Sequence, residues 1–302
     1  MGILDCIGST PLVSIEGMNP NPKVRLFAKL EGNNPGGSVK DRVALYMVEA
    51  AEREGRLTRD KIILEATSGN TGIGLAMIAA AKRYRVKLTM PACVSVERRK
   101  ALEAFGAELI LSPSEEGTDG AIRLAHKILA EAPDRYFMPN QFDNPANIQA
   151  HYETTGREIW EQTGGGVTHF IAGMGTTGTL MGAGKRLKEY NPGVAIVGVE
   201  PVKGHRIQGL KNMSEAIVPK IFAPLQLDER HVVNDEEAFD ATRMLAIKEG
   251  IFVGMSSGAA MHIAQKRSSE LREGVIVVLF PDRGDRYLST ALFTSVCGKC
   301  PP

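Results

Sequence analysis

The apolar residues of this chain come in short continuous runs separated by amphipathic segments. Runs rich in Val, Ile and Leu predict buried strands at residues 24–30, 61–66, 86–90, 108–111, 167–172, 195–199 and 275–280. Continuous apolar strands are typical of a parallel sheet covered on both faces. The pattern therefore indicates strands that lie inside the protein.

The segments between these runs carry apolar residues at helical spacing. They predict helices at residues 39–53, 73–83, 96–105, 121–130 and 236–248. The order strand, helix, strand predicts an α/β fold with open, mostly parallel twisted sheets covered by helices. Ligands of such folds bind at the carboxyl ends of the strands.

Charge and composition argue against nucleic acid and membranes as partners. The 302 residues include 36 Lys and Arg against 35 Asp and Glu, so no overall field attracts nucleic acid or an anionic membrane. The first residues lack a basic segment followed by an apolar run, and no uncharged apolar stretch has membrane-spanning length. We expect a cytoplasmic protein with no nucleic-acid or membrane partner.

The cysteines and histidines predict no metal site. Four cysteines are too few for a disulfide scaffold, so we expect Cys6 and Cys93 to be reduced thiols. Cys297 and Cys300 have the spacing of a redox dithiol or of half a zinc site, with an ordinary disordered tail as the alternative. The six histidines show no pair at metal-ligand spacing, and we interpret them as structural or solvated.

The first chemical candidate is Lys40, in a glycine-containing loop at residues 33–42 that opens a helix near Ser38. Lysine is unfavourable in the first turn of a helix, because the amides there carry partial positive charge. A lysine held there away from water has its charged form disfavoured, as a Schiff-base amine requires. The alternative is an exposed surface lysine, as most lysines are.

Two further turns join a strand to a helix. The first, at residues 65–72, precedes a helix expected to begin near Gly72. Its hydroxyls and free amides are typical of a carboxylate or phosphate site, although a plain capped helix explains them too. The second, at residues 173–179, has glycines that admit an anion and threonines that donate to it. Its spacing differs from the dinucleotide and Walker motifs, which favours a single phosphate ester.

A fourth turn at residues 253–259 again carries small polar residues between a strand and a helix. Each turn alone has a structural explanation, because tight turns of α/β sheets favour such residues. Together the four turns suggest one shared crevice.

Several strings of this sequence, in order and almost end to end, resemble the fold-type II pyridoxal-phosphate enzymes, and among them the cysteine synthases (O-acetylserine sulfhydrylases). The strings lie at residues 7–12, 34–42, 67–72, 91–99, 141–147, 175–179, 250–260 and 284–290. The resemblance implies two lobes: a smaller, mobile N-terminal lobe of residues 36–144 with the substrate-carboxylate loop, and a larger lobe of residues 1–35 and 145–302 with the cofactor-phosphate cup. It also implies a homodimer.

The resemblance also assigns roles. Lys40 is the lysine that binds pyridoxal 5'-phosphate as a Schiff base, Asn70 bonds the cofactor's phenolic oxygen, and Ser256 faces its pyridine nitrogen. The cofactor's phosphate is held by Gly175, Thr176, Thr177, Gly178 and Thr179. The substrate's carboxylate is held by Thr67, Ser68, Gly69 and Thr71, with Gln141 opposite. A hydroxyl at the pyridine nitrogen leaves that atom largely unprotonated, which favours elimination over transamination.

The implied reaction is a β-replacement that forms L-cysteine from O-acetyl-L-serine through an aminoacrylate intermediate. Lys40 serves in turn as covalent anchor, base and acid. The sulfur donor is sulfide, thiosulfate or the thiocarboxylate of a carrier protein.

Residues 207–213 and 281–286 look more like the B type of cysteine synthase than the A type. Lys211 stands where some B-type relatives have an arginine linked to O-phosphoserine use. Lysine lacks the bidentate fork of arginine, so phosphoserine is the alternative substrate and not the expected one.

Other functions share this scaffold. Cystathionine β-synthase, serine or threonine dehydratase and threonine synthase use the same lysine. Outside enzymes, an inactive scaffold that binds the C-terminal tail of serine acetyltransferase is the alternative. Intact Lys40, Asn70 and Ser256 favour the enzyme, although tail binding and catalysis can coexist.

Overall fold

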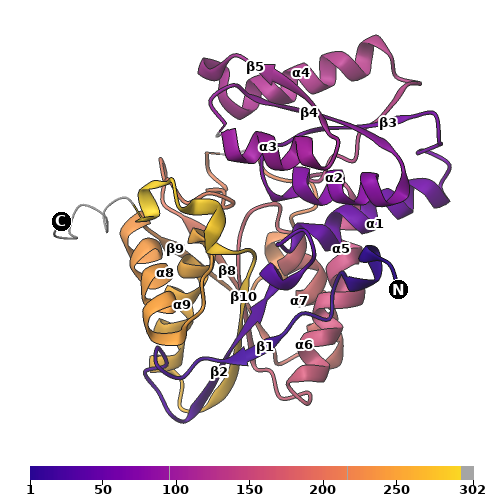
Figure 1. Cartoon of the computed structure of the whole chain (residues 1–302). Coiled ribbons are helices and arrows are strands. Elements are labelled where there is room, and N and C mark those ends of the chain that lie inside the picture. The colour runs from indigo at the N-terminus through magenta and orange to yellow at the C-terminus, as the bar shows by residue number, and fades with distance from the viewer. Residues whose placement is uncertain (95, 216, 294–302) are drawn as a thin grey trace. The chain divides into compact units, whose positions relative to one another are not determined.

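The computed structural model describes residues 1–94, 96–215 and 217–293. The chain divides into two compact units (Figure 1). One unit comprises Met1–Ile7 and Asn34–Ala150, and the other comprises Gly8–Asn33 and the chain from His151 onward. Both are α/β, as predicted. The pair Cys297 and Cys300 lies outside the described residues.

The larger unit contains a six-stranded sheet in the order β1-β2-β10-β7-β8-β9, parallel throughout except for the antiparallel pair β1 and β2. The strands are β1 (Leu12–Ser14), β2 (Val24–Leu30), β7 (His169–Gly173), β8 (Ala195–Pro201), β9 (Glu229–Val233) and β10 (Gly274–Phe280). Strands β7, β8 and β10 are buried along most of their length. Burial on both faces explains why they appear in the sequence as continuous apolar runs.

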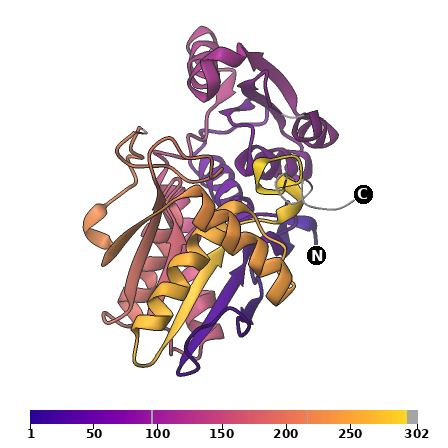
Figure 2. The same ribbon diagram turned by 90° about the vertical axis from the view of Figure 1, so that its left-hand side faces the viewer.

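Helices cover both faces of this sheet. Figure 1 shows α6 (Gly156–Gln162) and α7 (Gly178–Tyr190) on one face, and α8 (Asp235–Glu249) and α9 (Met255–Glu270) on the other, which faces the viewer in Figure 2. Shorter elements are the 3-10 helices η2 (Glu31–Asn33), η5 (Pro224–Gln226) and η6 (Gly284–Tyr287) and the π-helix η4 (His151–Thr155). In the part of the chain that the structure describes, η5 is the only regular element between β8 and β9.

The smaller unit contains a four-stranded parallel sheet in the order β5-β4-β3-β6. The strands are β3 (Ile62–Ala66), β4 (Arg85–Pro91), β5 (Glu108–Ser112) and β6 (Tyr136–Phe137). The helices are η1 (Ile3–Cys6), α1 (Lys40–Arg53), α2 (Asn70–Lys82), α3 (Val96–Ala104), η3 (Ser114–Glu116), α4 (Gly117–Glu131) and α5 (Pro145–Ala150). Alternation along β3 separates two cores: Ile63 packs with α1 and α2, whereas Ile62 and Leu64 pack with α4.

The elements missing from the sequence prediction are short or polar. Strands β1 and β6 have three and two residues, too few for a periodic signal. Strand β9 lies at the edge of its sheet and begins with Glu229, Arg230 and His231, which is typical of a protected edge strand. None of the described helices is long and apolar enough to span a lipid bilayer.

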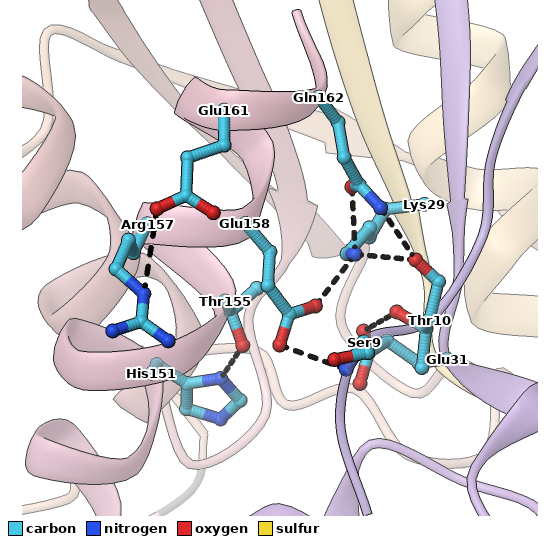
Figure 3. Close-up of polar contacts among 10 residues, drawn as sticks. All are labelled: Ser9, Thr10, Lys29, Glu31, His151, Thr155, Arg157, Glu158, Glu161 and Gln162. Carbon is cyan, nitrogen blue, oxygen red and sulfur yellow. Dashed lines mark hydrogen bonds and ion pairs between the residues drawn. The ribbon is translucent and has the colours of Figure 1, made fainter.

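A fully buried lysine ties the start of the larger unit to α6 (Figure 3). Lys29 Nζ donates to the Thr10 carbonyl at 2.7 Å, to Glu158 Oε2 at 2.7 Å and to Gln162 Oε1 at 2.8 Å. Glu158 Oε1 in turn accepts the Ser9 backbone N–H at 3.0 Å. A buried ammonium is tolerated when each of its three protons has an acceptor, so this cluster anchors the segment before β1.

We expect Lys29→Met to destabilise the protein by about 3 kcal/mol, because it leaves the Glu158 carboxylate partly buried without its cation. Replacing Glu158 with Gln in the same chain should recover part of the loss. Thermal or urea unfolding of the single and double variants measures both effects. A double variant less stable than Lys29→Met would contradict this account.

The smaller unit buries a carboxyl group at the end of β3. Glu65 is 3% exposed, and its Oε2 accepts the backbone N–H of Asn140 at 2.8 Å. Burial raises the pKa of Glu65 from 4.5 to about 8, against the opposing effect of the Asn140 hydrogen bond. The folded protein therefore holds this proton where the unfolded chain has released it.

We expect Glu65→Gln to gain stability relative to the parent protein as the pH rises from 5 to 8. The stability linked to the Glu65 proton is present below about pH 4.5 and declines up to about pH 8, whereas Gln keeps the acceptor and cannot ionise. The gain should be on the order of 3 kcal/mol, measured by unfolding at both pH values.

Glu52→Gln is the matched control. Burial raises the pKa of Glu52, but hydrogen bonds from Lys82 and Tyr84 outweigh burial and lower that pKa below its usual value. The stability that the Glu52 carboxylate contributes is therefore present above its usual pKa and lost in acid. The Glu52 variant should therefore lose stability relative to the parent as the pH rises from acid. The same pH trend in both variants would show that the buried Glu65 carboxyl does not titrate as described.

Candidate active site

Lys40 is the first residue of α1, two positions after the predicted start. The loop before it is pinned by Asp41, whose Oδ2 accepts the Gly36 N–H at 2.5 Å. Helix α2 packs closely beneath, since a Cβ at Gly74 would lie 3.1 Å from the Lys40 carbonyl oxygen and 3.2 Å from the Ala44 Cβ. Lys40 is half-buried, so it differs from an ordinary exposed surface lysine.

Asn70 is the first residue of α2, two positions before the predicted start. The residue that precedes the helix is Gly69, which has no side chain to cap it. No side-chain cap therefore competes with an anionic ligand at the start of α2. Thr67 and Ser68 complete the loop between β3 and this helix and are half-buried.

Gln141 lies against this loop. The Thr71 hydroxyl donates to Gln141 Oε1 at 2.6 Å, and Asn147 Nδ2 donates to the Gln141 carbonyl at 2.8 Å. Among the described residues, Gln141 Nε2 has no hydrogen-bond partner. Because the amide oxygen is taken by Thr71, the end of the side chain left for a ligand is the donor end. The predicted members of the carboxylate grip thus share one region of the smaller unit.

The predicted phosphate cup joins β7 to α7 in the larger unit. Gly178 begins α7, and Thr177 before it has φ +68°, a left-handed conformation that is unusual for a β-branched residue. A Cβ at Gly175 would lie 2.5 Å from the Gly209 carbonyl oxygen, so this position requires glycine. Such backbone strain is characteristic of ligand-binding loops.

Ser256 lies in the first turn of α9 and is 4% exposed. In the part of the chain that the structure describes, its hydroxyl has no hydrogen-bond partner. The residue preceding the helix, Gly254, packs against Asp282 and Tyr287 too closely for a side chain, and the Tyr287 hydroxyl donates to Asp282 Oδ2 at 2.6 Å. A nearly buried hydroxyl without a protein partner is available to a ligand.

Lys211 lies next to the start of the phosphate cup. Its backbone N–H donates to the Met174 carbonyl at 2.8 Å, which attaches the irregular segment between β8 and β9 to the start of the cup. The residue is half-buried. The larger unit thus places Lys211 beside the loop that the sequence predicts to bind phosphate.

Within its own unit, each of these groups suits one part of pyridoxal phosphate. The cup offers backbone amides and hydroxyls to a phosphate ester, Ser256 offers a hydroxyl to a ring nitrogen, and Lys40 offers an amine. Lys40, Asn70 and the carboxylate loop belong to the smaller unit, whereas the cup, Lys211 and Ser256 belong to the larger unit. Among the described residues, no group of three or more His, Cys, Asp or Glu is placed to bind a metal ion.

The sequence did not predict the contacts of two residues next to these loops. Glu65 bonds to Asn140, which precedes Gln141, and His151 bonds to Thr179 of the cup. The partners are 75 and 28 residues apart in the chain, so no local pattern signals either contact. Cys6 and Cys93 are free thiols, as predicted, and both are exposed.

Comparison with known proteins gives the family. The family model described as "Pyridoxal-phosphate dependent enzyme" matches residues 3–282. A cysteine synthase from Aquifex aeolicus is 48% identical over 97% of this chain and 92% of its own length. Cysteine synthase B from Pseudomonas aeruginosa is 47% identical over 96% of this chain and 97% of its own length.

A solved structure agrees. Cysteine synthase (OASS) from Entamoeba histolytica matches with a TM-score of 0.92 and 40% identity, covering 97% of this chain and 90% of that chain. The similarity therefore extends over both units, which confirms the predicted family and its fold. By sequence and by structure alike, the chain belongs to the pyridoxal-phosphate-dependent enzymes.

Proposed function

We propose that this chain is a cysteine synthase that forms L-cysteine from O-acetyl-L-serine and a sulfur donor, with sulfide as the simplest donor. Relatives that carry the name cysteine synthase match it nearly end to end. Its cofactor is pyridoxal phosphate, the cofactor of the family. The site residues assigned below rest on their positions within each unit.

The observation that carries the proposal is the Ser256 hydroxyl, nearly buried at the start of α9. A hydroxyl can donate a hydrogen bond to an unprotonated pyridine nitrogen, whereas a carboxylate would stabilise the protonated form of that nitrogen. That difference favours loss of a β-substituent over transfer of the amino group. Together with Lys40 at the start of α1, it supports β-replacement.

The bound cofactor supplies an aldehyde for covalent attachment and a ring that withdraws electrons from the substrate's Cα. Lys40 Nζ provides the attachment point and, once displaced by the substrate amine, accepts the Cα proton and later returns it. The first amides of α2 and Gln141 Nε2 orient the substrate carboxylate. The threonines and amides of residues 175–179 hold the phosphate at the start of α7.

The natural sulfur donor, the homodimer, the cytoplasmic location and the mobility of the smaller lobe stay predictions. The same holds for complexes with serine acetyltransferase or a sulfur-carrier protein. A pull-down with a C-terminal serine acetyltransferase peptide, assayed beside cysteine formation, separates a scaffold from an enzyme that also binds the tail.

The central test is the visible spectrum of the cofactor-loaded protein and of Lys40→Ala. The parent should absorb in the visible, change its band with O-acetylserine and recover it with sulfide as cysteine forms. Lys40→Ala should lose cysteine formation by about 1,000-fold or more.

Borohydride reduction should attach the cofactor to the Lys40 peptide, as judged by mass spectrometry. Exposed Lys23→Ala is the matched control and should keep full activity. A parent protein that shows no band after loading, or a Lys40 variant that retains a tenth of the activity, would refute the proposal.

A second test concerns Lys211. Lys211→Arg restores a planar fork suited to a phosphate group, and we expect it to raise kcat/KM for O-phosphoserine relative to O-acetylserine by about tenfold. Exposed Lys203→Arg, in the same irregular segment, should leave the ratio unchanged. If the parent already prefers O-phosphoserine, the substrate assignment moves to that ester; an unchanged ratio in Lys211→Arg removes Lys211 from the specificity site.

A further inference from the structure

His151 is fully buried between two threonine hydroxyls. Its Nδ1 lies 2.9 Å from Thr155 Oγ1, a contact drawn in Figure 3, and its Nε2 lies 3.2 Å from Thr179 Oγ1. Thr179 is the last residue of the phosphate cup. The imidazole therefore connects the cup to a side chain that lies outside it.

The ring's position is set by the backbone. His151 and Thr155 are the ends of the π-helix η4, a rare conformation that occurs frequently at functional sites. Directly after it, Gly156 meets α7: a Cβ there would lie 2.8 Å from the Arg186 Cβ and 3.0 Å from the Ala183 carbonyl oxygen. This close packing fixes η4 against the helix that begins at the cup.

The tautomer of the ring decides what Thr179 offers to a ligand. In a neutral imidazole one nitrogen donates and the other accepts. If Nε2 carries the proton, it donates to Thr179 Oγ1, and Nδ1 accepts the proton of the Thr155 hydroxyl. The proton of Thr179 is then directed to an anion in the cup. In the other tautomer Nε2 accepts the hydrogen bond from the Thr179 hydroxyl, whose proton is then not directed to an anion.

We propose that His151 is a positioning residue for phosphate binding, in which the Nε2–H tautomer, held by Thr155, directs the Thr179 hydroxyl proton to the cofactor's phosphate. The inference rests on the proposed function, because that function places a phosphate ester at residues 175–179. Thr179 touches the phosphate, and His151 acts only through it.

The test compares His151→Met with His151→Gln in the full-length apoprotein. Glutamine keeps an N–H near the position of Nε2, whereas methionine fills the space without a donor. Each variant is titrated with pyridoxal phosphate and with pyridoxal, which lacks the phosphate. We expect His151→Met to weaken pyridoxal phosphate binding by about 10- to 30-fold, to leave pyridoxal binding within about twofold, and His151→Gln to recover most of the loss.

Thr179→Val should reproduce the loss, and combining it with His151→Met should add little, because both changes remove one hydrogen-bonded unit. Nitrogen-15 NMR of the parent protein, which does not depend on any variant folding, should show a neutral His151 ring protonated at Nε2. A ring protonated at Nδ1 alone, or at both nitrogens, overturns the proposal.

Two further results would also overturn the proposal. Equal weakening of both ligands by His151→Met would show a purely structural role and leave the proposed function intact. A parent protein that binds pyridoxal as tightly as pyridoxal phosphate would overturn both this inference and the placement of the phosphate at residues 175–179.

Discussion

The starts of α2, α7 and α9, which no side chain caps, are the constraint on which the candidate ligand-binding loops of the two units depend. A helix leaves its first N–H groups without partners, and most helices satisfy them with a polar cap. Helix α8 does so through the reciprocal bonds of Asn234 and Glu237. Helices α2, α7 and α9 instead begin after Gly69, Thr177 and Gly254, none of which caps its helix through a side chain. Strands β3 and β7 lead into α2 and α7 at the carboxyl edges of their sheets. Helix α9 instead follows α8, so the strand expected before the turn at residues 253–259 is wrong: Val253 forms only an isolated bridge with Arg283.

The sequence predicted the strands that are buried on both faces and the turns that follow them, because apolar runs and glycines are local signals. Strand β2 begins and ends where predicted, at Val24 and Leu30. Helix α1 begins two residues later than predicted, at Lys40, and α2 begins two residues earlier than predicted, at Asn70. Helix ends depend on the geometry of the cap, which helix propensity does not describe. The contacts of Glu65 and His151 were beyond prediction, because the chain brings their partners from distant elements.

The two units accommodate buried ionisable groups by opposite means. The buried Lys29 ammonium has a carbonyl, a carboxylate and an amide oxygen as acceptors for its protons. Glu65 has a backbone N–H from Asn140 as its hydrogen-bond donor, and burial raises its pKa to about 8. A neutral acid beside Asn140 and Gln141 adds no negative charge to the region where an incoming carboxylate is expected to bind. A neutral Glu65 carboxyl therefore suits both its buried position and the expected binding of a carboxylate nearby.

The left-handed backbone at Thr177 has a consequence for folding. A φ of +68° costs a β-branched residue on the order of 1–3 kcal/mol. Such a conformation persists only when the surrounding structure over-determines it. The packing around the turn between β7 and α7 must therefore offset a strain that an ordinary connection between a strand and a helix does not have.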